Sequence, residues 1–204
     1  MKFSATDYKT FYAPKQQPAL LWIPTMKFIT IHGTGDPNEL GFQVDTEALY
    51  TFAYAIKMSY KKPNPPEGYY EYKVFPLEGI WDLVDKSIDS TVKSNYAYTL
   101  MIQQPDFVTI DVFNRFKESL LATKTNLRLK DVEYQELEEG LCCQMLHLGS
   151  YDDEPQTFKQ MEEMCLSLGH PRSSKFHHEI YLSDPRRTED SKLKTILRFS
   201  VKEG

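Results

Sequence analysis

The sequence has few of the residues that define fibrous or membrane-spanning chains. Only 9 of its 204 residues are glycine, 41% are hydrophobic and 26% are charged, which is typical of a globular protein and excludes collagen-like and low-complexity classes. No run approaches the roughly 18 consecutive apolar residues of a membrane helix, and the N-terminus lacks the apolar centre of a signal peptide. We therefore expect a cytoplasmic protein without a membrane partner.

Positive charge and cysteine are also scarce. The 24 Lys and Arg residues are outnumbered by 29 Asp and Glu, and a net charge of −5 provides no long-range attraction to phosphate backbones. Direct nucleic-acid binding is therefore disfavoured. Cys142, Cys143 and Cys165 are odd in number and lack metal-type spacing, so we expect small buried side chains rather than ligands. We predict no metal, no cofactor and a monomeric chain.

Aromatic residues, by contrast, are abundant. The chain contains 13 Tyr, 12 Phe and 2 Trp, together 13% of its residues, which is more than a core of this size requires. We expect some of these rings to be exposed for binding a ligand.

Proline, glycine and apolar spacing divide the chain into a lead and a series of elements. Residues 1–27 contain three prolines and predict an N-terminal lead with at most one short helix. The expected strands are 28–32, 69–77, 96–103, 140–148, 175–182 and 193–201, and the expected helices are 45–60, 109–123 and one that begins at Pro155 and ends at Gly169. Residues 78–81 are expected to form a turn or bulge, and 133–139 a solvated strand edge or linker.

The order strand-helix-strand-strand occurs twice, about 110 residues apart. It predicts a single α+β domain over residues 1–204, with repeat one at about 28–104 and repeat two at about 140–202. Such a pseudo-twofold duplication forms antiparallel sheets with helices on one face and a concave groove on the other. A groove of this kind is the default place for a ligand.

The expected strand at residues 175–182 carries the strongest candidate chemistry. Its period of two places Phe176 and His178 on an apolar side, under helices, and His177, Glu179 and Tyr181 together on an open side. A carboxylate between an imidazole and a phenol is a candidate general base or acid, especially among aromatic rings that exclude water. The alternative interpretation of the same pattern is a solvated polar face.

Aromatic clusters precede this strand in the sequence. Tyr70 and Tyr72, Trp81, and Tyr98 belong to segments expected beside the groove, where a flat or cationic ligand would stack on them. Ordinary core packing and cross-strand pairing explain such rings equally well.

Several segments together resemble the stand-alone GyrI-like small-molecule-binding proteins, over almost the entire chain. These segments are DYK at 7–9, YAP at 12–14, IHGTGDP at 31–37, PLEGIW at 76–81, QPDFVT at 104–109 and HEIYLSDPRR at 178–187. Relatives of this family include effector-binding domains of multidrug-sensing transcription activators and a gyrase-inhibitory protein. The resemblance implies two strand-helix-strand-strand modules and a groove that accepts aromatic, often cationic, compounds around a glutamate.

The resemblance also implies a function. Members of the stand-alone branch hydrolyse cyclopropanoid genotoxins, and the family glutamate, the aromatic residue after it and the aromatic wall correspond to Glu179, Tyr181 and Trp81. The expected function is thus detoxification by ring opening, with Glu179 and Tyr181 as catalytic residues. The alternatives are a module that sequesters drugs without chemistry and a protein that modulates gyrase by direct interaction.

Overall fold

The computed structural model describes residues 5–203, so the first four residues of the predicted N-terminal lead lie outside it. The described chain forms two compact units: unit 1 contains residues 26–77 and 83–137, and unit 2 contains residues 5–25, 78–82 and 138–203. The prediction of one domain over residues 1–204 stays a prediction. Within residues 5–203, every helix is too short or too polar to cross a lipid bilayer.

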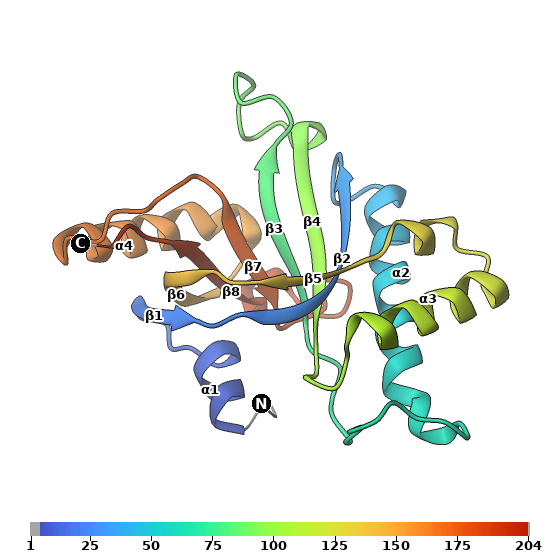
Figure 1. The fold of residues 1–204 in the computed structure, drawn as a ribbon. Helices are drawn as coiled ribbons and strands as arrows, with labels where there is room; N and C mark the ends of the chain where they lie inside the picture. Colours follow the sequence, from blue (N-terminus) through green and yellow to red (C-terminus); the bar gives the residue numbers. More distant parts are fainter. Residues whose placement is uncertain (1–4, 204) are drawn as a thin grey trace. The chain divides into compact units, whose positions relative to one another are not determined.

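Unit 1 packs two helices against a small antiparallel sheet (Figure 1). Strand β2 (Met26–Thr34) lies between β4 (Tyr96–Gln104) and β5 (Glu133–Leu137) and pairs antiparallel with both. Helix α2 (Leu40–Lys57) contributes Leu49, Phe52 and Ile56 to the core, at the spacing of one helical face. Helix α3 (Ile110–Thr123) contributes Phe113, whose ring stacks on Phe52 at 4.8 Å between centroids.

Unit 2 has a larger sheet with a helix on each side (Figure 1). Its strand order is β1 (Ala19–Ile23), β6 (Gly140–Leu148), β8 (Lys194–Ser200), β7 (His177–Tyr181) and β3 (Leu77–Leu83), of which residues 78–82 belong to this unit. Helix α4 (Glu154–Ser167) buries Met161 and Cys165 against Cys143 of β6 and Leu197 and Phe199 of β8. Helix α1 (Ala5–Tyr12) lies on the other side.

Short 3-10 segments connect these elements. They are η1 (Met58–Lys61), η2 (Lys93–Asn95), η3 (Leu127–Asp131), η4 (Tyr151–Asp153) and η5 (Asp190–Lys192).

The predicted α+β class and the repeated element order are confirmed. Along the chain, β2-α2-β3-β4 is followed by β6-α4-β7-β8, and the pairings of β2 with β4 and of β7 with β8 are antiparallel. The expectation for the cysteines is also confirmed, because all three are buried and unbridged.

The prediction for residues 69–81 is wrong. Residues 69–76 form no strand, whereas 78–81, expected as a turn, lie inside β3. Pro76 cannot donate a ladder hydrogen bond, and the rings of Tyr69, Tyr70 and Tyr72 pack around Phe107 instead of alternating across a sheet. The alternating tyrosines thus reflect ring packing within unit 1, not strand pairing.

Three smaller expectations also need correction. Helix α2 begins at Leu40 rather than near Asp45, which lies buried inside the helix and pairs with Arg128. Phe176, expected on a side packed under helices, is 43% exposed, because it lies just before the start of β7. The acidic run forms the edge strand β5, as expected, but its last residue, Glu139, belongs to unit 2 and is ion-paired there.

Gly33 provides a test of packing in unit 1. It lies opposite Tyr98 in the β2–β4 register, and a Cβ atom at this position would meet the buried Tyr98 ring at 2.4 Å. We expect Gly33→Ala to destabilise the protein by about 1–3 kcal/mol, since the ring must leave its place. Gly41→Ala, in open space on α2, is the matched control and should stabilise by up to about 1 kcal/mol.

The free energy of unfolding is measured by urea titration, with circular dichroism as the probe of folding. Combining Gly33→Ala with Tyr98→Leu should remove most of the penalty, because the shorter side chain no longer covers residue 33. Equal stabilities of the two glycine variants would contradict this account of the strand pair.

Candidate functional site

Strand β7 places neighbouring residues on opposite faces of the unit 2 sheet, as its sequence pattern predicts. Glu179 lies opposite Leu197 of β8, whose other neighbour, Met145 of β6, continues the row. His178 lies opposite Arg198, which continues to Gln144. Two rows therefore cross the sheet, one beneath α4 and one on the side of α1.

Glu179 is the centre of the row beneath α4. The Tyr181 hydroxyl donates a hydrogen bond to Glu179 Oε2 at 2.8 Å, and His177 Nε2 lies 2.8 Å from Glu179 Oε1. Trp81 Nε1 of β3 in turn donates to the Tyr181 hydroxyl oxygen at 2.8 Å. The structure thus brings together four predicted site residues, with the Glu179 carboxylate as the acceptor at the end of a chain of donors.

This face is closed, contrary to the prediction of an open side. Glu179 is only 8% exposed. The Phe158 ring of α4 lies edge-on to the His177 ring, 4.9 Å away, and Glu154 in the first turn of α4 makes hydrogen-bonding contact with Glu179. The Tyr151 ring lies edge-on to Tyr181 at 6.1 Å. Helix α4 therefore covers the polar side of β7, which the alternation pattern alone indicates as solvent-facing.

The electrostatics of this cluster are acidic. Burial, the Glu179 charge and contact with Glu179 raise the pKa of Glu154 well above its usual range. Burial and the same carboxylate raise the pKa of Tyr181, and burial with Glu179 and Glu154 raises the pKa of Tyr151 to about 12. Tyr181 and Tyr151 therefore remain protonated at neutral pH and act as donors. Across residues 5–203, His, Cys, Asp and Glu form no group of three suited to a metal ion.

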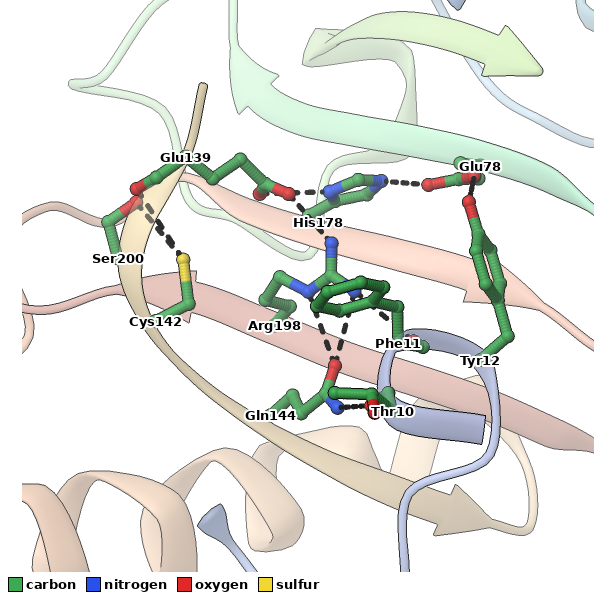
Figure 2. A network of polar contacts seen from close by, with 10 residues as sticks. All are labelled: Thr10, Phe11, Tyr12, Glu78, Glu139, Cys142, Gln144, His178, Arg198 and Ser200. Atoms are coloured by element: carbon green, nitrogen blue, oxygen red, sulfur yellow. Dashed lines mark hydrogen bonds and ion pairs between the residues drawn. The ribbon is translucent and has the colours of Figure 1, made fainter. Parts of the chain in front are cut away.

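The opposite face of β7 carries a compensated charge network (Figure 2). His178 Nε2 lies 2.9 Å from Glu78 Oε2, and His178 Nδ1 lies 3.0 Å from Glu139 Oε1. Arg198, 2% exposed, donates to the other oxygen of Glu139 at 2.7 Å. Two carboxylates thus meet one imidazolium and one guanidinium.

The same network attaches α1 to the sheet (Figure 2). The Tyr12 hydroxyl donates to Glu78 Oε1 at 2.7 Å, and Arg198 donates to the Phe11 carbonyl oxygen at 3.3 Å. Gln144 donates to the Thr10 carbonyl oxygen at 2.9 Å. Because the charges on this face are paired and the same residues bind the backbone of α1, we assign this face a structural role.

Neighbouring opposite charges shift the pKa values of His178 and Glu139. Burial alone lowers the pKa of His178, but Glu139 and Glu78 outweigh burial and raise it to about 9. Burial raises the pKa of Glu139, but His178 and Arg198 outweigh it and lower that pKa to about 2. Both groups are therefore charged at neutral pH.

The three remaining predicted ligand residues belong to unit 1. Tyr70 and Tyr72 contact each other edge-on at 6.4 Å, and both lie against Phe107. Tyr98 is separate from them: its hydroxyl donates to Asp45 Oδ2 at 3.1 Å, and its ring meets Phe42 at 5.2 Å. Their part in ligand binding stays a prediction.

Sequence reasoning missed Glu154 and Tyr151. Both follow the Gly149 turn, and Glu154 directly precedes Pro155, a helix-starting signal that reveals the position of the residue but not the face it covers. It also missed the pairing of His178 with Glu78 and Glu139, which are 100 and 39 positions away in the chain. Only the strand order brings these residues together.

Comparison with known proteins places this geometry among related folds. The family described as a GyrI-like small-molecule-binding domain matches residues 16–202. A solved Listeria innocua structure, described as an uncharacterized conserved protein, is 37% identical, with a TM-score of 0.90 over 97% of this chain and 98% of its own. A second, described as a hydrolase from the same organism, is 36% identical, with a TM-score of 0.88 and the same coverage.

A more distant likeness concerns the fold alone. The C-terminal domain of EcmrR is 10% identical, with a TM-score of 0.54 over 92% of this chain and 98% of its own. No curated protein matches the sequence.

The compensated network predicts a pH window for stability. The Glu139 contribution is complete above about pH 4.5, its ordinary pKa, and is lost as pH falls toward about 2. The His178 contribution is complete below about pH 6.5 and is lost as pH rises toward about 9. We expect the melting temperature to be highest between these two limits, near pH 4.5 to 6.5, and to decline on both sides.

Nitrogen NMR of histidine side chains provides the matching measurement. His178 should remain protonated at pH 8. The control variant His170→Gln, at a partly buried residue outside this network, should leave the pH range of highest stability unchanged. A His178 ring that is neutral at pH 7 would refute the charge assignment.

The donor chain of the acidic face predicts the effect of Tyr181→Phe. Loss of the hydroxyl leaves Trp81 Nε1 without this acceptor and Glu179 without this donor, at a cost of about 1–3 kcal/mol in unfolding free energy. Tyr54→Phe, on the exposed surface of α2, should change stability by less than about 0.5 kcal/mol. Urea unfolding monitored by tryptophan fluorescence measures the stability of both variants. Equal losses of stability would argue against a stabilising role for the hydrogen bonds of Tyr181 with Trp81 and Glu179.

Proposed function

Since the chain belongs to the GyrI-like small-molecule-binding domain family, we propose that it binds aromatic compounds beside Glu179 and hydrolyses cyclopropanoid genotoxins. The observation that carries this proposal is a buried carboxylate that accepts a hydrogen bond from Tyr181 and lies among aromatic side chains, with Trp81 and Tyr151 both in contact with Tyr181. The 36% identity to a Listeria innocua hydrolase supports an enzymatic role. The biological role would be detoxification of a DNA-alkylating xenobiotic.

The proposed reaction adds water across one strained carbon–carbon bond. Glu179 accepts a proton from water while the water oxygen bonds to the cyclopropane methylene carbon. The carbon–carbon bond breaks, and its electron pair moves into the attached electron-poor ring system, which takes up a proton from solvent. Glu179 then returns its proton to solvent, so the net reaction adds one water molecule. Ring strain and aromatisation provide the driving force, so the protein has to orient the ligand and one water molecule.

The neighbouring residues have distinct roles in this proposal. Tyr181 donates to Glu179 and holds the orientation of the carboxylate, and Trp81 holds Tyr181 through its indole N–H. His177 lies at the second Glu179 oxygen and completes the positioning. The ligand contacts predicted for Tyr70, Tyr72 and Tyr98 rest on the aromatic pattern of the sequence and stay predictions.

A second candidate is a binding module that sequesters cationic aromatic drugs without chemistry. The favouring observation is that, within residues 5–203, no Lys or Arg pairs with Glu179 or Glu154, so His177 is the one basic side chain that a ligand cation would meet beside these carboxyl groups. The two candidates differ in stoichiometry. A sequestering protein protects one ligand per chain and leaves it unchanged, whereas a catalyst converts an excess.

The test is turnover of a cyclopropane-bearing DNA alkylator, with ring-opened product followed by mass spectrometry. We expect multiple turnovers by the wild type and at least about a hundredfold lower kcat/KM for Glu179→Gln, because the amide cannot accept the water proton. Glu163→Gln, the same substitution on the exposed surface of α4, should retain wild-type turnover.

Two outcomes would count against the proposed hydrolysis. Equal turnover by Glu179→Gln would remove Glu179 from the mechanism. Stoichiometric protection with unchanged ligand would favour the sequestering module instead.

A further inference from the structure

Glu154 is a buried carboxyl group that the proposed mechanism does not use. It is the first residue of α4, is 6% exposed and makes hydrogen-bonding contact with Glu179. Its Oε1 atom is buried and meets no hydrogen-bond donor within the described part of the chain. A carboxyl in this position requires an explanation, since a buried carboxylate without a donor costs several kcal/mol.

The groups around this carboxyl pair come from four elements. His177 and Tyr181 of β7 contact Glu179, and Trp81 of β3 contacts Tyr181. Tyr151 and Asp152 of η4 face the pair, and Asp152 adds negative charge to the surroundings of Glu154.

Further negative charge surrounds Tyr151. Asp184, after β7, and Asp190 of η5 both act on it. In residues 5–203, His177 is the one basic side chain in contact with either carboxyl of the pair, and no Lys or Arg is ion-paired with them.

Two carboxyl groups in contact cannot both be ionised at moderate pH without a large repulsion. Glu179 accepts a hydrogen bond from the Tyr181 hydroxyl and has His177 at its other oxygen. Glu154 receives no donor at Oε1, which suits the neutral acid. The proton shared by the pair is therefore assigned to Glu154, in agreement with the raised pKa of this group.

We propose that Glu154 and Glu179 form a carboxyl pair that holds one proton and exchanges it for the positive charge of an aromatic cation. The inference rests on the proposed small-molecule site around Glu179 and names the charge state in which that site accepts each ligand class. With its proton, the pair carries one negative charge and accepts neutral aromatic compounds, such as an uncharged cyclopropanoid. A cation beside Glu179 stabilises the second negative charge, so Glu154 releases its proton to solvent.

This exchange gives cation binding a defined pH dependence. If binding releases one proton, the association constant rises by up to about tenfold per pH unit over the range in which Glu154 is protonated in the free protein. A neutral ligand of the same shape shows no such rise, because nothing replaces the proton. The pair thus provides one site with two charge states, each suited to a different class of aromatic ligand.

Calorimetry with two matched ligands tests the exchange. N-methylacridinium is a permanent planar cation, and N-methylacridone has the same three rings and no charge. Each is titrated at pH 7 in buffers of different ionisation enthalpy, which reports the protons released on binding. We expect N-methylacridinium to release up to about one proton per bound ligand and N-methylacridone to release none.

Two glutamine variants test whether Glu154 is the residue that releases the proton when the cation binds. Glu154→Gln keeps a donor toward Glu179 but has no proton to lose, so it should bind N-methylacridinium without proton release and without the rise of affinity with pH. Glu163→Gln, on the exposed surface of the same helix, should release protons as the wild type does. Binding of the cation by wild type without proton release, or equal release by Glu154→Gln, would overturn the exchange.

A ligand-free measurement separates this inference from the proposed function. Carbon NMR of glutamate carboxyls should reveal one group in the wild type that remains protonated at pH 6 and is missing from Glu154→Gln. Its absence from the wild type would overturn the proton pair even if ligands bind. Failure of both acridine ligands and of the alkylator to bind would instead overturn the proposed function and the cation exchange, with the NMR result deciding on the pair alone.

Discussion

Burial of charge on both faces of one short strand organises unit 2. β7 presents His178 on the side of α1 and Glu179 beneath α4, and both residues are less than one-tenth exposed. A buried charge is tolerated only when other groups compensate for it, so each face requires its own set of partners. The strands beside β7 provide these partners, Arg198 from β8 on one face and Trp81, acting through Tyr181, from β3 on the other.

The buried charges on the two faces have different partners, and this difference indicates a structural role for one face and a ligand-binding role for the other. On the α1 side, two carboxylates face His178 and Arg198, and the network also holds the backbone carbonyls of α1 (Figure 2). The two negative and two positive charges on this face are equal in number and form ion pairs with one another. Beneath α4, Glu179 and Glu154 have His177 as their basic neighbour, and the rest of their surroundings are hydroxyls and rings. A buried carboxyl pair with a single basic neighbour, among aromatic residues, is more typical of a ligand site than of a structural core.

Sequence reasoning predicted the features that depend on neighbouring residues and missed those that depend on contacts between residues far apart in the chain. The repeated element order and the alternation along 177–181 depend on neighbours in the chain, and both were predicted correctly. Residues 69–76 were assigned wrongly because alternating tyrosines suit a strand as well as a ring cluster, and the contact with Phe107 that distinguishes them is about 35 residues away in sequence. The prediction that Glu179 lies on an open side is wrong for a similar reason, since the polar pattern of a strand does not reveal which helix covers it.

The sequence alone therefore determined which residues share a face, because the period of a strand is a local property of the backbone. It also identified Glu179, Tyr181 and His177 as one group, which their hydrogen bonds bear out. The tertiary structure decided what lies against each face: Glu154 from the start of α4 on one side, and Glu78, Glu139 and Arg198 on the other. These contacts join residues up to 100 positions apart, and only the order of strands and the direction of each helix bring them within hydrogen-bonding distance.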